Sequence, residues 1–320
     1  MSRVVALSGG VGGAKLAAGL AAVVADEELL VAVNTGDDFE HLGLTICPDI
    51  DSNLYALAGL NDVARGWGRR DESWNFMQAL AQLRGEDWFQ LGDRDLATHV
   101  LRSQRLRQGA SLSAVTTELA RALGIAARVL PMSDDPVRTI VDTEAGRLCF
   151  QDYFVRRRCE PRVRGFDYEG AGRARAHPDL LAALRDPALE AVVICPSNPW
   201  LSVGPMLAMP ALRDALAHCA APVVAVSPIV GGRALKGPAD KLMRELGLKP
   251  GTAAIAAHYQ GLVDGLLIDE TDRADLAALA HCGCAVRCAP TVMSDAGARM
   301  ALAHEALRFA ASLRGTAGKA

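Results

Sequence analysis

The chain has 320 residues, and its 34 lysines and arginines stand against 37 aspartates and glutamates, for a formal net charge of −3. Half of the residues are hydrophobic and 22% are charged, a balance that excludes disorder for most of the chain. The slightly acidic total gives no reason to expect a nucleic-acid partner, and no apolar run approaches the ~18 residues of a membrane span. We therefore expect a globular protein whose partners are small molecules.

The N-terminus and the cysteines predict a cytoplasmic protein. Arg3 precedes an apolar stretch, but a glycine-rich run and Lys15 interrupt it, so it lacks the continuous apolar core of a signal peptide. In a chain of this length without an export signal, the 8 cysteines are predicted to be reduced thiols.

Short apolar runs alternate with helical patterns along the chain. The run at residues 3–7 leads through a glycine-rich turn to a helical pattern at 14–25 and a second run at 29–33. Later apolar runs lie at 127–130, 191–195, 223–226 and 266–268, and helical patterns lie at 210–218, 239–246, 273–280 and 296–313. This order predicts a Rossmann-like, doubly wound α/β fold with a mainly parallel sheet.

Two regions depart from that alternation. Residues 53–124 lack a buried-strand pattern, which predicts a helical insertion. Residues 138–176 combine short strand patterns with an arginine-rich stretch, which predicts a small antiparallel β excursion. The helical patterns of the first region lie at 72–84, 95–107 and 111–123. We expect a single α/β domain over residues 1–320 that carries both insertions.

The loop after the first strand predicts a phosphate site. Residues 8–15 read Ser-Gly-Gly-Val-Gly-Gly-Ala-Lys, and glycines let a backbone approach an anion closely. The helix that follows would offer free N–H groups and a positive dipole end. A tight strand–helix turn without a ligand is the alternative, because the run lacks the Gly-Lys-Ser/Thr ending of a Walker motif.

Acidic residues cluster in the loops after the second strand. Four aspartates, Asp37, Asp38, Asp49 and Asp51, fall within 15 residues. A hard cation such as Mg²⁺ takes oxygen ligands and often one or two carboxylates together with substrate phosphates. The cluster therefore predicts a metal that bridges phosphates. The alternative is that single aspartates cap helices or turns.

Three further features have a functional and a structural interpretation. Asp95, His99 and Arg102 lie at helical spacing on one face. Such a polar stripe could line a site, or it could be a solvated helix face. Trp67 suits stacking on a planar ring and equally suits helix packing. The loop at 227–238 combines glycines with basic residues before a helix, which suits a second anionic group.

Eight motifs in order carry a family resemblance. They are SGGVGGAK at 8–15, NTGDD at 34–38, CPDID at 47–51, LGDRDLATH at 91–99, PMSDDP at 131–136, FQDY at 150–153, PSNP at 196–199 and VSPI at 226–229. From residue 3 to about residue 295 the chain resembles the phospholactate transferases of coenzyme F420 biosynthesis, the CofD/FbiA family.

The resemblance implies an activity. These enzymes move a phospho-acid from a guanylyl diphosphate adduct of lactate, phosphoenolpyruvate or a related acid. The acceptor is the deazaflavin Fo, 7,8-didemethyl-8-hydroxy-5-deazariboflavin. The terminal ribityl hydroxyl of Fo attacks the phosphorus that carries the acid, GMP leaves, and Mg²⁺ assists. The resemblance also implies a homodimer, and it leaves open which acid the donor carries.

The resemblance implies roles for individual residues. Asp37 and Asp51 are the expected catalytic and metal-binding residues, with Asp51 also near the Fo hydroxyl and with Asp38 and Asp49 as alternates. Either Asp51 or His99 is a candidate acceptor of the hydroxyl proton. The expected substrate-binding residues are Gly10, Gly12 and Gly13 at the phosphates, Ser197, Asn198, Gly232 and Lys236 on the guanylyl side, and Asp51, Trp67 and Gln90 at Fo.

Two rival interpretations use the same glycine loop. A YvcK-like regulator would bind a nucleotide sugar without turning it over, but the motifs at 47–51 and 91–95 are those of the transferases. An NAD-dependent oxidoreductase would need an acidic ribose-binding residue at the end of the second strand, where this chain has Asn34.

Overall fold

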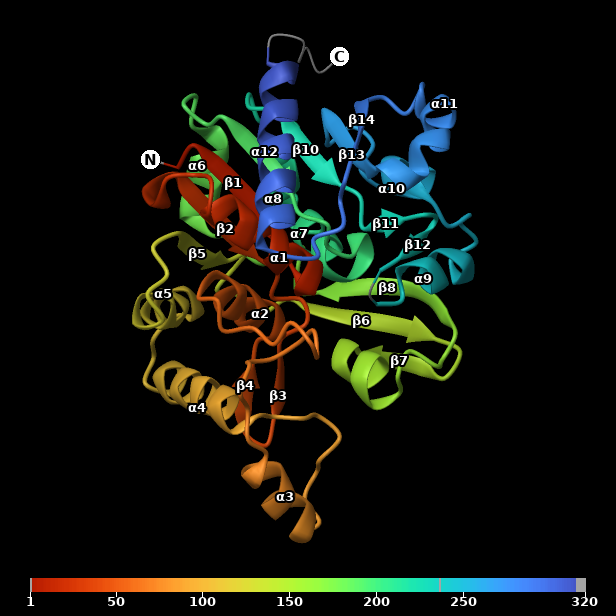
Figure 1. The fold of residues 1–320 in the computed structure, drawn as a ribbon. Helices are drawn as coiled ribbons and strands as arrows, with labels where there is room; N and C mark the ends of the chain where they lie inside the picture. The colour runs from red at the N-terminus through yellow and green to blue at the C-terminus, as the bar shows by residue number, and fades with distance from the viewer. Residues whose placement is uncertain (1, 236, 315–320) are drawn as a thin grey trace.

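The computed structural model describes residues 2–235 and 237–314 (Figure 1). A seven-stranded parallel sheet forms its centre, in the order β14-β13-β10-β9-β1-β2-β5. The strands are β1 (Val4–Ser8), β2 (Leu29–Val33), β5 (Arg128–Pro131), β9 (Ala191–Ile194), β10 (Val223–Val226), β13 (Gly265–Asp269) and β14 (Ala285–Ala289). The predicted doubly wound α/β fold is confirmed.

The apolar runs form strands because both faces of the sheet are buried. In β1, Val5 and Leu7 belong to one hydrophobic core, while Val4 and Ala6 belong to the other. Full burial of one such Val or Leu side chain stabilises the fold by about 1.5–3 kcal/mol. Helices that cover the Val4 face include α1 (Gly10–Ala21), α2 (Pro48–Leu57), α5 (Leu112–Ala122) and α12 (Ala296–Leu313). Helices that cover the Val5 face include α6 (Pro178–Arg185), α7 (Gly204–Leu207), α8 (Pro210–Ala217), α9 (Ala239–Glu245) and α10 (Thr252–His258).

The strand order places a topological switch point between β1 and β9. From β1 the chain builds outward through β2 and β5 on one side. It then returns to the other side of β1 with β9 and continues through β10, β13 and β14. In open parallel sheets a crevice opens at such a point, outside the carboxyl ends of the strands. The loops that follow β1 and β9 therefore face one another.

Residues 58–111 extend from the body as two helices and a long connection. Figure 1 shows α3 (Asn75–Gln82) at the far end of this extension and α4 (Asp93–Arg107) beside it. The hairpin of β3 (Phe39–His41) and β4 (Leu44–Ile46), which the sequence did not predict, packs against α4. The predicted helices at 72–84 and 95–107 are thus present with shifted ends.

The second excursion is a three-stranded antiparallel sheet, β7-β6-β8. Its strands are β6 (Arg138–Thr143), β7 (Gly146–Cys149) and β8 (Val163–Glu169), and η2 (Asp152–Arg156) joins the last two. The predicted helix at 273–280 is wrong in type over its first part, which is the 3₁₀ turn η4 (Glu270–Asp275) before α11 (Leu276–Leu279). The remaining elements are η1 (Asp26–Glu28), η3 (Pro199–Val203), β11 (Ile229–Val230) and β12 (Arg233–Ala234). Among the described residues no helix is long and apolar enough to span a membrane.

Candidate active site

The loops after β1 and β9 are joined by hydrogen bonds at the switch point. The Gly9 N–H donates to Ser197 Oγ at 3.0 Å, and that hydroxyl donates to the Gly9 carbonyl at 2.7 Å. Asn198 Oδ1 accepts the N–H groups of Trp200 and Leu201 at 3.0 and 3.1 Å, so it caps η3. Ser197 and Asn198 thus shape this crevice, and their predicted guanylyl contacts remain predictions.

The glycines of the first loop are required by close packing inside the protein. A Cβ on Gly12 would lie 2.5 Å from the Pro196 carbonyl oxygen, and one on Gly13 would lie 2.5 Å from Ser197 Oγ. Gly10 has φ +64°, a conformation that favours glycine. Its N–H donates to Asp49 Oδ1 at 2.5 Å. The turn therefore brings the start of α1 against the loop after β9 and against the Asp49 carboxylate.

Three aspartates are packed together beside this turn. Asp37 and Asp38 follow β2, and Asp49 lies in the first turn of α2, where Pro48 begins the helix. All three are buried. Asn34 Nδ2 donates to Asp49 Oδ2 at 2.9 Å and to Asp37 Oδ1 at 3.5 Å, which ties the end of β2 to α2. The sequence predicted a loop at 48–53, but Asp49 and Asp51 lie on the helix α2.

Burial sets the protonation of this acidic cluster, defined here as Asp37, Asp38 and Asp49. Desolvation, reinforced by Asp49 and Asp38, raises the pKa of Asp37 well above its ordinary value. Desolvation also raises the pKa of Asp38 to about 7 and that of Asp49 to about 6. Asp38 Oδ1 lacks a hydrogen-bond partner among the described residues. The cluster is thus a set of carboxylate oxygens with too little positive charge around it.

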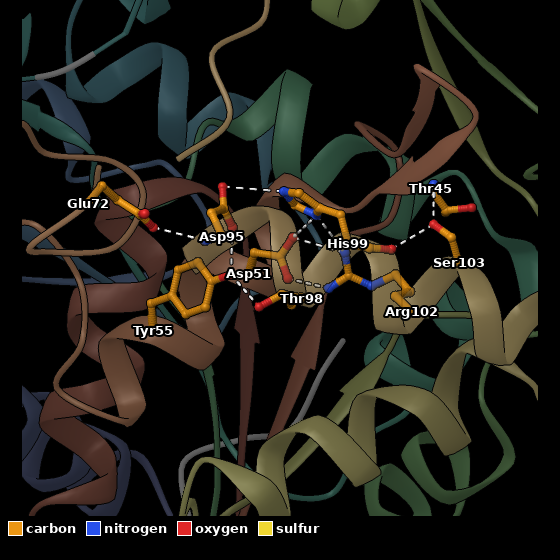
Figure 2. Close-up of polar contacts among 9 residues, drawn as sticks. All are labelled: Thr45, Asp51, Tyr55, Glu72, Asp95, Thr98, His99, Arg102 and Ser103. Atoms are coloured by element: carbon orange, nitrogen blue, oxygen red, sulfur yellow. Dashed lines mark hydrogen bonds and ion pairs between the residues drawn. The ribbon is translucent and has the colours of Figure 1, made fainter. Parts of the chain in front are cut away.

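Asp51 lies further along α2 and has a different environment (Figure 2). Arg102 on α4 donates from Nη1 to Asp51 Oδ2 at 3.0 Å and from Nη2 to Oδ1. His99 places Nδ1 3.5 Å from Asp51 Oδ2 and Nε2 3.3 Å from Asp95 Oδ2. The Tyr55 hydroxyl donates to Asp95 Oδ1 at 2.5 Å. Asp51 is therefore a paired carboxylate.

The predicted metal pair is divided between these two environments. Asp37 has Asp49 and Asp38 as its acidic neighbours, whereas Asp51 interacts with Arg102 and lies near Asp38. Oxygen and nitrogen atoms of Asp51, Asp95 and His99 also lie within 4.8 Å of one another, a spacing that a metal ion could use. The Arg102 guanidinium on Asp51 opposes a cation there by charge repulsion. The acidic cluster is the better candidate.

The remaining predicted substrate residues are distributed around the crevice. Trp67 is 44% exposed and lines a hollow together with Val11 and Ala14 of α1 and Ser52 of α2. Gln90 is exposed, and its side-chain nitrogen donates to the Asp87 carbonyl at 2.8 Å, so none of its described contacts joins it to this site.

Gly232 lies in the turn between β11 and β12. The Gly231 and Gly232 N–H groups each donate to an oxygen of Asp272 at 2.9 Å. Both N–H groups therefore already have a protein carboxylate as their hydrogen-bond acceptor. Lys236 lies outside the described residues.

The sequence did not single out three polar residues that shape the site. Asn34 ends β2 and bonds two of the clustered aspartates, a position that the switch-point rule could have flagged. Arg138 lies on β6, and its charge opposes the rise in the pKa values of Asp37 and Asp38. Gln151 Nε2 donates to the Asp37 carbonyl at 3.5 Å. Both lie about 100 residues further along the chain than the aspartates, so spacing did not join them to the cluster, although the FQDY motif at 150–153 contains Gln151.

Comparisons with known proteins agree with this arrangement. The family model "2-phospho-L-lactate transferase CofD" matches residues 4–295. A phosphoenolpyruvate transferase of Streptomyces griseus is 40% identical over 98% of this chain and 99% of its own length. A 2-phospho-L-lactate transferase of Methanosarcina mazei is 41% identical over 90% of this chain and 94% of its own length. A structure of BH3568 from Bacillus halodurans has TM-score 0.61 at 16% identity over 96% of this chain and 98% of its own, which shows likeness of fold.

The chain belongs to the CofD family of phospholactate and phosphoenolpyruvate transferases, and it is a transferase enzyme. The resemblance found in the eight sequence motifs is thereby confirmed. The family model covers the chain from its first strand to the residue before α12. Full-length identity to enzymes decides against the regulator and the oxidoreductase alternatives.

Proposed function

We propose that this enzyme transfers a phospho-acid from a guanylyl diphosphate donor to the terminal ribityl hydroxyl of Fo in coenzyme F420 biosynthesis. The hydroxyl oxygen forms a bond to the phosphorus that carries the acid, the bond from that phosphorus to the GMP oxygen breaks, and GMP leaves. The observation that carries the proposal is the meeting of two loops, the buried acidic cluster and Asp51 at one switch point. Such transfer needs positioning and charge stabilisation more than covalent chemistry.

The donor is proposed to lie along the paired loops at the start of α1. Helix α1 is 12 residues long, and the N–H groups at its start suit phosphate oxygens. Gly10, Gly12 and Gly13 would contact the phosphates through their backbone, and since the Gly10 N–H donates to Asp49, Gly12 and Gly13 would provide the N–H donors. Ser197 and Asn198 would contact the guanylyl half together with Gly232 and Lys236. Since the Gly232 N–H donates to Asp272, Gly232 offers its carbonyl for that contact.

The acidic cluster fits a magnesium ion. Its donors are carboxylate oxygens, the ligands that Mg²⁺ prefers, and Asp38 Oδ1 is a buried oxygen that lacks a partner among the described residues. Asp37 would hold the ion, together with Asp38 and Asp49. When bound, the ion would offset charge on the donor phosphates. Asp51, the other predicted ligand, faces Arg102 and is assigned to the acceptor side instead.

The acceptor is proposed to lie between Asp51 and Trp67. Trp67 lines a hollow against α1 and α2, where an indole ring could cover a deazaflavin. Asp51, paired with Arg102, would accept a hydrogen bond from the ribityl hydroxyl and orient it. Gln90 would join only at the rim of that region, because its side chain is exposed.

A transfer assay tests this function. Purified protein is incubated with Fo, the guanylyl diphosphate adducts of lactate, enolpyruvate and glycerate in competition, and Mg²⁺, and products are read by mass. We expect a phospho-acid adduct of Fo and free GMP, and the preferred adduct identifies the acid. Asp51→Asn should abolish transfer in a protein that still folds, with a lower melting temperature because the buried Arg102 charge loses its partner. Near-wild-type turnover by that variant would contradict the assignment, and binding of donor without product would contradict the function.

The family resemblance also leads us to propose a cytoplasmic homodimer. Light scattering of the purified protein at micromolar concentration measures the mass directly. A mass of one chain at every concentration would rule out the dimer.

A further inference from the structure

Arg102 is a fully buried arginine whose described side-chain partners are two functional-site neighbours. It lies on α4, is 0% exposed, and reaches Asp51 on α2, 51 residues away in sequence. Removing a guanidinium from water is costly unless a partner compensates it. Buried ion pairs can often be replaced by apolar residues without loss of stability. A pair retained at the edge of a transfer site therefore suggests a task other than stability.

We propose that Arg102 is a positioning residue for the acceptor: it fixes the Asp51 carboxylate, with His99 and Asp95 behind it, in the orientation that receives the acceptor hydroxyl. This role rests on the proposed function. It concerns residues of α4, an element outside the glycine loops and the acidic cluster.

The geometry shows how the orientation is fixed. Both Arg102 Nη atoms donate to Asp51, one to each oxygen, so the carboxylate cannot rotate without losing a hydrogen bond. His99 Nδ1 lies 3.3 Å from Arg102 Nη1 and packs beside the guanidinium (Figure 2). His99 Nε2 lies 3.3 Å from Asp95 Oδ2, and Asp95 also accepts the Tyr55 hydroxyl. Arg102 thus lies in a fixed polar cage, defined here as Asp51, Tyr55, Asp95 and His99.

The cage is tied to the body of the protein at both ends. Ser103 Oγ donates to the His99 carbonyl at 2.7 Å and accepts the Thr45 N–H at 2.8 Å, which joins α4 to β4. Glu72 accepts the Asp95 N–H at 2.9 Å, which joins α4 to the connection before α3. Small shifts of α4 would therefore move Arg102, and with it Asp51. Misplacement of a reacting group by about 1 Å can reduce a rate about 100-fold.

A double-mutant cycle tests the role. The variants are Asp51→Asn, Arg102→Met and the double variant, with Arg102→Lys as the conservative change. Arg105→Met is the matched control, because Arg105 lies on the same helix in a half-exposed pair with Glu118. The readouts are kcat with Fo, KM for Fo, KM for the donor, and the melting temperature.

We expect Arg102→Met to reduce kcat about 100-fold with little change in the donor KM, and Arg102→Lys to recover part of the rate. The double variant should be no slower than Asp51→Asn, because Arg102 acts through Asp51. Arg105→Met should match the wild type. If the two rate losses multiply instead, Arg102 acts independently of Asp51 and the proposal is wrong.

The melting temperature separates positioning from a purely structural role. Arg102→Met leaves the buried Asp51 charge unpaired and should lower the melting temperature, whereas the double variant removes both charges and should regain it. A reduced kcat in Arg102→Met, measured well below its melting transition where the variant is folded, supports positioning. A folded Arg102→Met variant with the kcat of the wild type would overturn it. A wild type that makes no Fo adduct would instead contradict the proposed function, a result that needs no variant.

Discussion

Replacing Asp38 with asparagine should stabilise the metal-free enzyme while impairing its activity. Asp38 is 4% exposed, and its Oδ1 lacks a hydrogen-bond partner among the described residues. Desolvation raises its pKa to about 7, and the nearby Asp51 contributes in the same direction, against the opposing effects of Arg138 and Arg102. Asparagine keeps the shape of the side chain and removes the charge. The destabilising anion then disappears along with a proposed magnesium ligand.

The size and the pH range of this effect follow from the pKa. Because the folded pKa lies above the ordinary 3.8, the folded state binds more protons than the unfolded state between those values. Stability therefore falls as pH rises from about 4 to about 7 and is level above that range. At about 1.4 kcal/mol for each pH unit, the difference between 3.8 and about 7 amounts to about 4 kcal/mol. With an unfolding entropy of about 2.1 cal/mol/K per residue, this corresponds to about 6 °C in melting temperature.

Thermal unfolding of protein treated with EDTA measures the effect between pH 5 and pH 8.5. We expect Asp38→Asn to melt about 6 °C above the wild type at pH 8, with the gap falling to about a third at pH 5. Added Mg²⁺ should stabilise the wild type more than the variant at pH 8, because the ion replaces the missing positive charge. Asp26→Asn, at an exposed aspartate of η1, is the control and should change little. The reasoning would be refuted if the variant melted at or below the melting temperature of the wild type at pH 8. It would also be refuted if the difference in melting temperature between variant and wild type were the same at every pH.

Two further variants test the packing and the acceptor side. Gly12→Ala should lower the stability by about 1–3 kcal/mol, because its Cβ would lie 2.5 Å from the Pro196 carbonyl oxygen, and chemical denaturation with Gly172→Ala as the open-space control measures this. Equal stabilities of Gly12→Ala and the wild type would show that the loops after β1 and β9 can separate without a cost in free energy. Trp67→Ala should raise the KM for Fo about tenfold with a smaller change in kcat, because the exposed indole contributes binding area and no reacting atom. Val63→Ala, at an exposed residue four positions away, is its control, and an unchanged KM would place the deazaflavin elsewhere.

The central sheet could be predicted because its inner strands are buried on both faces. β1 and β2 are continuous apolar runs, and the sequence marked them as such. β14 escaped prediction because it is an edge strand: Ala285 is exposed and Arg287 is half-buried, so no apolar run marks it. β8 escaped prediction because its charges are paired across the sheet, with Arg147 of β7 contacting Asp167 and Glu169. Pairs of that kind are invisible in a single segment.

The meeting of the loops at the switch point could be predicted for the same physical reason. Strand order brings the ends of parallel strands to one edge, so the loops that follow strands could be collected as candidates from the order of the apolar runs alone. The different surroundings of the individual aspartates could not be predicted from spacing. Asp49 and Asp51 are two residues apart on α2, yet one faces Asn34 and Gly10 while the other faces Arg102. The difference arises from the rotation of the helix and from α4, which lies far along the chain.

Charge balance supports the proposal of a divalent cation at a site of this composition. Four carboxylates, those of Asp37, Asp38, Asp49 and Asp51, face two guanidinium groups, those of Arg102 and Arg138. Fully ionised, this set carries two excess negative charges in a buried region, which is why burial favours the protonated forms of the three clustered acids. A diphosphate donor would add further negative charge and could not approach such a set. One Mg²⁺ would supply two positive charges, enough to balance the ionised set and remove its repulsion of the donor. The −3 of the whole chain gives no sign of this requirement, because it is created by where the fold places four side chains.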